Sequence, residues 1–257
     1  MVHSEPRDDV AVPAEAAESP SSGNATSQPG GLNQQRILSA AVEFIDREGL
    51  PALTMRRLGG FLGVEAMALY RYVPSREDLL DGIVETVLDG LHHDPEVHLH
   101  AEHGWQDYLQ RLAHGIRRIA LAHPAVFPLV ATRPPDAPWI RPPLRSLHWL
   151  ESFFTVLTDN GFSDEAAVIA YRAYTTLLLG HLLLEVSHQG VVLTTEDDAE
   201  APVGADPSDA GLTKYPHLRA LEGLLDQDET VTEFEEALES LLDRLDVLMQ
   251  HPRRQRH

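Results

Sequence analysis

Arginine, tyrosine and small side chains alternate between Thr54 and Leu80, in the run TMRRLGGFLGVEAMALYRYVPSREDLL. A guanidinium group can hold two acceptors at once, as on a phosphate or on the edge of a base. In a helix from Val64 to Tyr72, helical spacing turns Val64, Ala68 and Leu69 inward. The outward face then carries Ala66, Met67, Tyr70, Arg71 and Tyr72. Such a face suits insertion into a groove.

The elements that position this face are readable from the same stretch. Met55, Leu58 and Leu62 fall on one side of a helix that Thr54 caps, and Gly63 supplies the turn into the next segment. Two helices this short need a third behind them, which the apolar stripe of Asn33–Glu48 provides. The pattern predicts a helix-turn-helix, whose second helix enters the major groove of DNA. An ordinary helical hairpin joined by glycine is the structural alternative.

Five histidines and three acids between His92 and His103 invite a metal-binding interpretation. The spacing argues against a hydrolytic zinc motif, because H-E-x-x-H is absent and Leu99 stands where H-x-x-E-H would need its first histidine. A solvated histidine-rich connector is the favoured interpretation, with a bound transition metal as the alternative. We expect no catalytic residue, no metal site and no cofactor.

Composition limits the class of protein. The 257 residues hold no cysteine, which excludes disulfides and thiolate sites and fits a cytoplasmic location. No run approaches 18 consecutive apolar residues, so we expect no membrane span. The formal charge of −20 opposes unspecific coating of nucleic acid. Residues 33–80, however, balance six arginines against six carboxylates, so binding there would rest on a few placed arginines and on a second copy.

The remainder of the chain predicts helices and no sheet, so the expected fold class is all-α. Residues 1–31 have the composition of a disordered tail, and residues 190–216 that of a mobile acidic loop. Residues 32–80 form the expected helix-turn-helix domain, continued by a linking helix to Leu91, and residues 92–250 the second domain. Its helices at 163–186 and 232–250 have apolar faces that suit a partner chain.

The predicted helix-turn-helix domain, residues 32–80 and called the head below, resembles the DNA-binding signature of the tetracycline-repressor (TetR) family. The matching features are Leu53-Thr54, Arg56, Leu58, Leu62-Gly63-Val64, Leu69-Tyr70, Ser75-Arg76 and Leu79-Leu80. The likeness extends to the tetracycline-binding repressors at Trp105-Gln106-Asp107, Thr132-Arg133-Pro134 and Gly161-Phe162-Ser163. It implies an all-helical homodimer with an N-terminal helix-turn-helix domain and a C-terminal domain for ligand binding and dimerisation.

The resemblance also implies roles for single residues at the DNA. Five would face bases: Ala66, Met67, Ala68, Arg71 and Tyr72. Five would face phosphates: Thr54, Met55, Arg56, Tyr70 and Arg76. Arg71 is the best candidate for bidentate readout of guanine, and a solvated surface arginine is the alternative.

The ligand positions of the family are implied at His92, Leu112, Ile116, Leu129 (or Val130), Phe153, Thr176 and Leu184. Most of these residues are apolar where the family holds magnesium and a drug, and Mg²⁺ needs oxygen ligands. The prediction is therefore an apolar or aromatic effector and not a magnesium–tetracycline complex. Plain core packing is the alternative for each position.

The function predicted is a homodimeric repressor that a small molecule releases from a palindromic double-stranded DNA operator. An activator of the same architecture remains open, because the sign depends on where the operator lies. A helical metal enzyme that uses the histidines at 92–103 is the alternative from another class.

Overall fold

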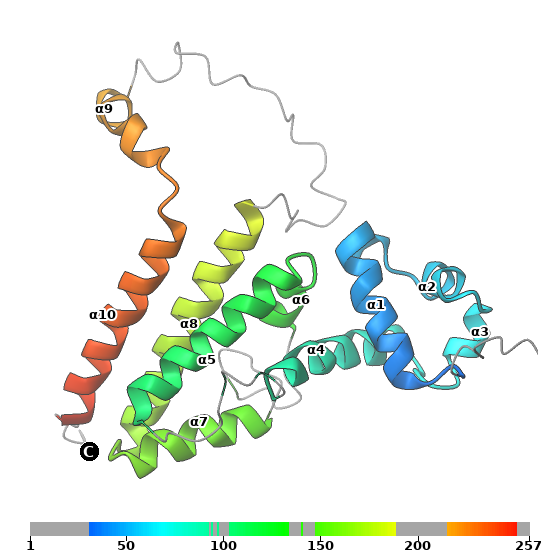
Figure 1. Cartoon of the computed structure of the whole chain (residues 1–257), viewed down its shortest axis with the longest axis horizontal. Helices are drawn as coiled ribbons and strands as arrows, with labels where there is room; N and C mark the ends of the chain where they lie inside the picture. The colour runs from blue at the N-terminus through cyan, green and yellow to red at the C-terminus, as the bar shows by residue number, and fades with distance from the viewer. Residues whose placement is uncertain are drawn as a thin grey trace, which may run out of the picture. The chain divides into compact units, whose positions relative to one another are not determined.

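A computed structural model describes residues 31–92, 94, 97, 103–133, 140, 147–188 and 215–250. In this part of the chain every regular element is helical, which confirms the all-α fold class (Figure 1). The elements in order are α1 (Gln34–Glu48), η1 (Leu50–Ala52), α2 (Met55–Leu62), α3 (Ala66–Leu69), α4 (Arg76–His92), α5 (Trp105–Ala122), α6 (Phe127–Thr132), α7 (Leu147–Asp159), α8 (Asp164–His188), α9 (Pro216–Leu225) and α10 (Thr230–Gln250).

The first helices begin and end where the sequence predicts. Asn33 caps α1 by accepting the Arg36 N–H at 2.8 Å, and Thr54 caps α2 by accepting the Arg57 N–H at 3.1 Å. Gly63 ends α2 with a φ angle of +72°, in the left-handed region that residues other than glycine rarely adopt. The buried face of α1 packs against both α2 and α4.

The second helix of the motif is shorter than expected. We predicted one helix from Val64 to Tyr72, but α3 spans only Ala66–Leu69 and a turn continues to Tyr72. The Val64 N–H donates to the Gly59 carbonyl at 2.9 Å, so Val64 closes the turn instead of opening the helix. At the other end, Val73 precedes Pro74, and a residue before proline disfavours helix.

Helix α4 joins the head to the rest of the molecule. The Ser75 hydroxyl accepts the Asp78 N–H at 3.0 Å and donates to the Asp78 carboxylate at 2.6 Å, which fixes its start. Helix α4 also packs on α5 and α6. A Cβ atom added at Gly82 would lie only 2.7 Å from the Leu38 side chain, so α1 and α4 approach as closely as glycine allows.

The second domain is built around α8, which packs against α5, α6, α7 and α10 (Figure 1). Helix α10 packs along α8 in the same chain. By length and composition α8 could cross a membrane, contrary to our expectation that no segment could. Its inner face includes Tyr174, Leu178 and Leu182 in the core, so we interpret it as the central helix of the domain.

Helix α9 was not predicted, because Pro216 was assigned to the end of an acidic loop. Proline is favoured in the first turn of a helix, and here it starts one. All residues of α9 are exposed. Residues 1–30 of the predicted tail (1–31) and residues 190–214 of the predicted loop (190–216) lie outside the described residues.

Candidate DNA-binding and effector sites

Three arginines of the head are exposed and, within the described residues, without an ion-pair partner: Arg56, Arg71 and Arg76. Each was predicted to face DNA. Arg47 instead pairs with Glu43 at 2.7 Å, and Arg57 pairs with Glu48 at 3.0 Å. The guanidinium groups of Arg56, Arg71 and Arg76 therefore remain available to donate their N–H groups to a phosphate or a base.

The surface of α3 and the turn after it carries the other predicted contacts. Met67 is 74% exposed, and Tyr70 and Tyr72 are each 41% exposed. Ala66 and Ala68 are half-buried, while Leu69 is buried and anchors the segment on the core. The buried Leu69 and the exposed Met67, Tyr70 and Tyr72 match the predicted sides of the segment, whereas Val64, Ala66 and Ala68 are all half-buried and do not distinguish them.

Two of the predicted phosphate contacts need restatement. The Met55 side chain is in the core, at 8% exposure, so the prediction that it faces a phosphate is wrong for the side chain. Its helical spacing with Leu58 already placed it inward. What Met55 can offer is its backbone N–H in the first turn of α2. Thr54 is exposed, but its hydroxyl oxygen already accepts the Arg57 N–H.

Arg57 holds the head together. Its guanidinium donates to the Glu48 carboxylate at 3.0 Å and to the Ala52 carbonyl at 3.2 Å. It also lies over the Phe44 ring, 5.3 Å from the centroid. These contacts fix α2 against the end of α1 and η1, so Arg57 positions the helix that also carries Arg56.

The second domain encloses a cavity of about 40 Å³ at the junction of α4, α5, α6, α7 and α8. Its lining is Leu88, Leu91, Leu112, Ile116, Phe127, Val130, Trp149, Phe153, Tyr171, Tyr174, Thr175, Leu178 and Leu179. None of these side chains is charged. Burial raises the pKa of Tyr171 to about 12 and also raises the pKa of Tyr174 well above its usual value, so both phenols stay neutral at physiological pH.

Three of the seven predicted pocket residues line this cavity: Leu112, Ile116 and Phe153. Leu129 is buried but does not line it, and Val130, the other residue left open at that position, does. Thr176 is exposed and Leu184 is 64% exposed, so neither side chain lines this cavity. One residue along a helix turns a side chain by 100°, which is why Thr175 points inward and Thr176 does not.

The aromatic side of the cavity was missed. Phe153 lies against Tyr171 and Tyr174, with ring centroids 5.7 and 5.6 Å apart. Tyr174 donates its hydroxyl to the Leu109 carbonyl at 2.8 Å, which fixes its ring in the wall. A signal was present, since Tyr171, Tyr174 and Leu178 fall at helical spacing on the inner face of α8.

Helix α6 connects the cavity to the head. It lines the cavity through Phe127 and Val130. Just beyond its end, the Arg133 guanidinium donates to the carboxylates of Asp81 at 2.5 Å and Glu77 at 2.6 Å, both on α4. A displacement of α6 would therefore pull directly on the first turns of α4.

His123, four residues before α6, forms a second connection, to α1. Its Nδ1 lies 2.7 Å from the Asp46 carboxylate, beside a hollow of about 650 Å³ between α1, α4 and α5. The hydrogen bond to Asp46 outweighs partial burial and raises the pKa of His123. The protonated imidazole is therefore favoured in the folded protein.

This pKa shift predicts a pH-dependent contribution to stability. A raised pKa adds stability that is fully present below the unfolded value and is lost as the pH rises through the folded value. Because the pair is about a third exposed, we expect only ~0.5 kcal/mol. In urea denaturation, His123→Gln should cost more at pH 5.5 than at pH 9, and Asp46→Asn should behave alike. An equal cost at both pH values would contradict the assignment.

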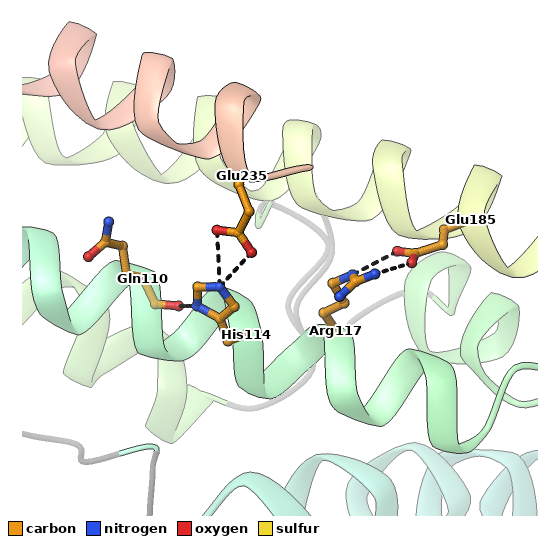
Figure 2. A network of polar contacts seen from close by, with 5 residues as sticks. All are labelled: Gln110, His114, Arg117, Glu185 and Glu235. Carbon is orange, nitrogen blue, oxygen red and sulfur yellow. Dashed lines mark hydrogen bonds and ion pairs between the residues drawn. The ribbon is translucent and has the colours of Figure 1, made fainter. Parts of the chain in front are cut away.

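Polar contacts also fix α10 (Figure 2). Arg117 on α5 and Glu185 on α8 form two hydrogen bonds of 3.1 and 2.5 Å, and Arg117 lies over the Phe234 ring of α10. His114 bridges the Gln110 carbonyl, at 2.7 Å, and the Glu235 carboxylate, at 2.9 Å. These contacts connect α5, α8 and α10 to one another.

The histidine cluster leaves the metal alternative untested. The His92 side chain and most of residues 93–102 lie outside the described residues. Within the described part, no group of three or more histidine and acidic side chains is placed to hold a metal ion. The cavity lining in particular offers no carboxylate or imidazole.

A helix-turn-helix head with exposed arginines, joined to a helical domain with an apolar cavity, defines a class of two-domain DNA-binding regulators. Residues 37–83 match the family model for bacterial regulatory proteins of the tetR family, and residues 99–249 match the model for the tetracycline-repressor-like C-terminal domain. The chain belongs to the TetR family. It is an all-α transcriptional regulator, as the resemblance of residues 32–80 predicted.

Individual relatives agree with this assignment. The class D tetracycline repressor of Escherichia coli is 29% identical over 217 residues, which are 84% of this chain and 90% of that protein. A possible TetR-family regulator from Streptomyces coelicolor has a solved structure with a TM-score of 0.64 and 29% identity, covering 84% of this chain and 100% of that one. ActR of the same organism, solved with actinorhodin, has a TM-score of 0.62 and 25% identity over 85% and 97%.

Proposed function

We propose that this chain is a homodimeric repressor that a small, uncharged, apolar or aromatic molecule releases from a near-palindromic operator. One observation carries the proposal. Helix α6 lines the cavity and is followed by Arg133, whose ion pairs to Glu77 and Asp81 hold the start of α4 beside the DNA-binding head.

The proposed dimer forms through α8 and α10. Exposed apolar side chains lie on both helices, at Val168, Ile169 and Leu184 on α8 and at Val231 and Val247 on α10. The contacts of Arg117 and His114 hold the two helices in one unit, as a bundle of four helices between two copies requires. Two heads would then meet successive major grooves, about 34 Å apart. We propose that the dimer acts in the cytoplasm.

The effector is proposed from the cavity lining. The lining consists of aromatic rings and aliphatic side chains, and its polar groups are the Thr175 hydroxyl, the Trp149 indole N–H and two phenols, so it suits a planar molecule of low charge. The cavity of about 40 Å³ is far smaller than a drug-sized ligand needs, so binding must push its walls apart. A magnesium–tetracycline complex does not fit this lining, which lacks carboxylate oxygens. The structure of ActR with actinorhodin supports the proposal that this fold takes an organic effector.

The proposed coupling between the cavity and the head requires only a small displacement. A shift of an ångström or two in α6 would move both heads out of register, and a coupling free energy of ~1–3 kcal/mol is enough to regulate. Gel-shift titration against the upstream region of its own gene tests the proposal. We expect specific retardation at moderate salt that an aromatic effector reverses. Retardation equal to that of unrelated DNA would refute it.

Arg71 is expected to carry much of the operator affinity. It is exposed, unpaired within the described residues and next to α3, as a guanine-binding arginine must be. Arg71→Ala should weaken operator binding by about 5- to 100-fold and relax specificity at one position of each half-site. Arg71→Lys should not restore it, because an ammonium group lacks the planar pair of donors. Fluorescence anisotropy on a selected operator measures both.

The neighbours Arg56 and Arg57 should differ in their salt dependence. Arg56→Ala removes a phosphate contact in each copy, so the slope of log K against log salt should become less steep by about 1 per copy. Arg57→Ala should weaken binding several-fold at unchanged slope, since it acts through Glu48 and Ala52. A flatter slope for Arg57→Ala would place that residue on the DNA instead.

A further inference from the structure

The surface between Thr54 and Arg76 lacks the side chains that read adenine. Adenine presents an acceptor at N7 and a donor at N6, and the side chains that bind both at once are asparagine and glutamine. This segment contains neither. Its single carboxylate, Glu65, could accept only from the amino group of a base. Adenine therefore has no bidentate partner on this surface.

What the surface offers at the start of α3 is apolar. Met67 is 74% exposed, more than any other large apolar side chain of the head. Ala66 and Ala68 on either side are half-buried and carry no polar atom in their side chains. In the major groove the apolar group of a base pair is the 5-methyl group of thymine, and contact with it is worth what burying a methyl group is worth. A first turn made of Ala-Met-Ala can discriminate bases in this way.

We propose that each head reads its half-site through thymine methyl groups packed against Met67 and through guanine bound by Arg71, without a bidentate contact to adenine. The inference rests on the proposed function, since it assumes that α3 enters a major groove. It adds the class of operator that this head selects: thymine-containing steps beside a guanine, recognised on the thymine strand of each A·T pair.

Base analogues separate the two strands of an A·T pair. A preferred site is first selected from a pool of randomised duplexes with the full-length protein. Replacing its thymines one at a time by deoxyuridine removes only the methyl group, and replacing the paired adenines by 7-deaza-adenine removes only N7. We expect about four-fold weaker binding for each contacted methyl group and less than two-fold for each adenine N7. At the guanine bound by Arg71, 7-deaza-guanine should cost at least about five-fold.

Variants of Met67 assign the contact. Met67→Ala should weaken binding to the thymine duplex and lose the deoxyuridine penalty, whereas Met67→Leu should keep most of that penalty. Because Met67 is largely exposed, neither substitution should impair folding. A large effect of 7-deaza-adenine without any effect of deoxyuridine would overturn the inference while leaving the repressor proposal intact. If selection enriches no sequence at all, the proposed function itself fails.

Discussion

Replacing Arg117 by leucine is expected to lower the free energy of unfolding by about 3–5 kcal/mol. Glu185, its partner, is only 8% exposed, so the substitution leaves a carboxylate buried without the guanidinium that neutralises it. The same change removes the cation that covers the Phe234 ring, 5.3 Å from its centroid. Urea denaturation at pH 7 measures the loss.

A double variant separates the cost of the unpaired charge from the value of the pair. Arg117→Leu with Glu185→Leu leaves no buried charge, so it should recover most of the stability that Arg117→Leu loses. Glu235→Gln is the matched control on the same face, because Glu235 and His114 are a surface pair and should contribute under ~1 kcal/mol. A loss of less than 1 kcal/mol in Arg117→Leu would mean that the Glu185 carboxylate finds another partner.

The position of this ion pair gives it a role in assembly. Arg117 joins α5 to α8 through Glu185, and its contact with Phe234 extends the connection to α10. If α8 and α10 form the dimer surface, loss of the contact between Arg117 and Phe234 should weaken the packing of α10 against the second copy of the chain. Sedimentation of Arg117→Leu at temperatures where it remains folded should then show weaker dimerisation than the wild type.

The helices of the head could be predicted from the sequence because each feature that starts, ends or orients them depends only on neighbouring residues. A cap at Thr54, a glycine at 63 and apolar residues at helical spacing each act within a few residues. The same reading made α3 too long, since the hydrogen bond from Val64 to Gly59 depends on how the chain turns in space. The family resemblance placed Met55 on a phosphate, although its helical spacing with Leu58 turns that side chain into the core.

The cavity was less predictable because five helices make it. Leu112, Ile116 and Phe153 were named by position from the family resemblance, and all three line the cavity. The same resemblance named Thr176, one residue from the lining residue Thr175, and the nearly all-round apolar pattern of α8 gives no sharp inner side that would have corrected it. Long-range contacts such as that from Arg133 to Glu77 and Asp81 leave no periodic trace in the sequence at all.

Replacing Phe153 by alanine should have the second of the two largest effects and should test the effector site directly. The ring is 3% exposed and contacts three other rings, those of Phe154, Tyr171 and Tyr174. Removing it costs about 3–5 kcal/mol through lost burial and the cavity left behind. It also widens a cavity that now holds only about 40 Å³, so a small aromatic molecule can enter without displacing the walls.

Ligand rescue tests whether the widened cavity can hold a small aromatic molecule. Indole at millimolar concentration should raise the melting temperature of Phe153→Ala by several degrees and leave the wild type almost unchanged, because only the variant has room for it. Phe154→Ala is the control, since Phe154 is half-buried, packs on Phe153 and does not line the cavity. If indole raised the melting temperature of both variants equally, it would be binding beside α7 in general and not specifically in the cavity. Rescue of Phe153→Ala alone would show that the space beside Tyr171 and Tyr174, which α6 also lines, accepts an aromatic molecule.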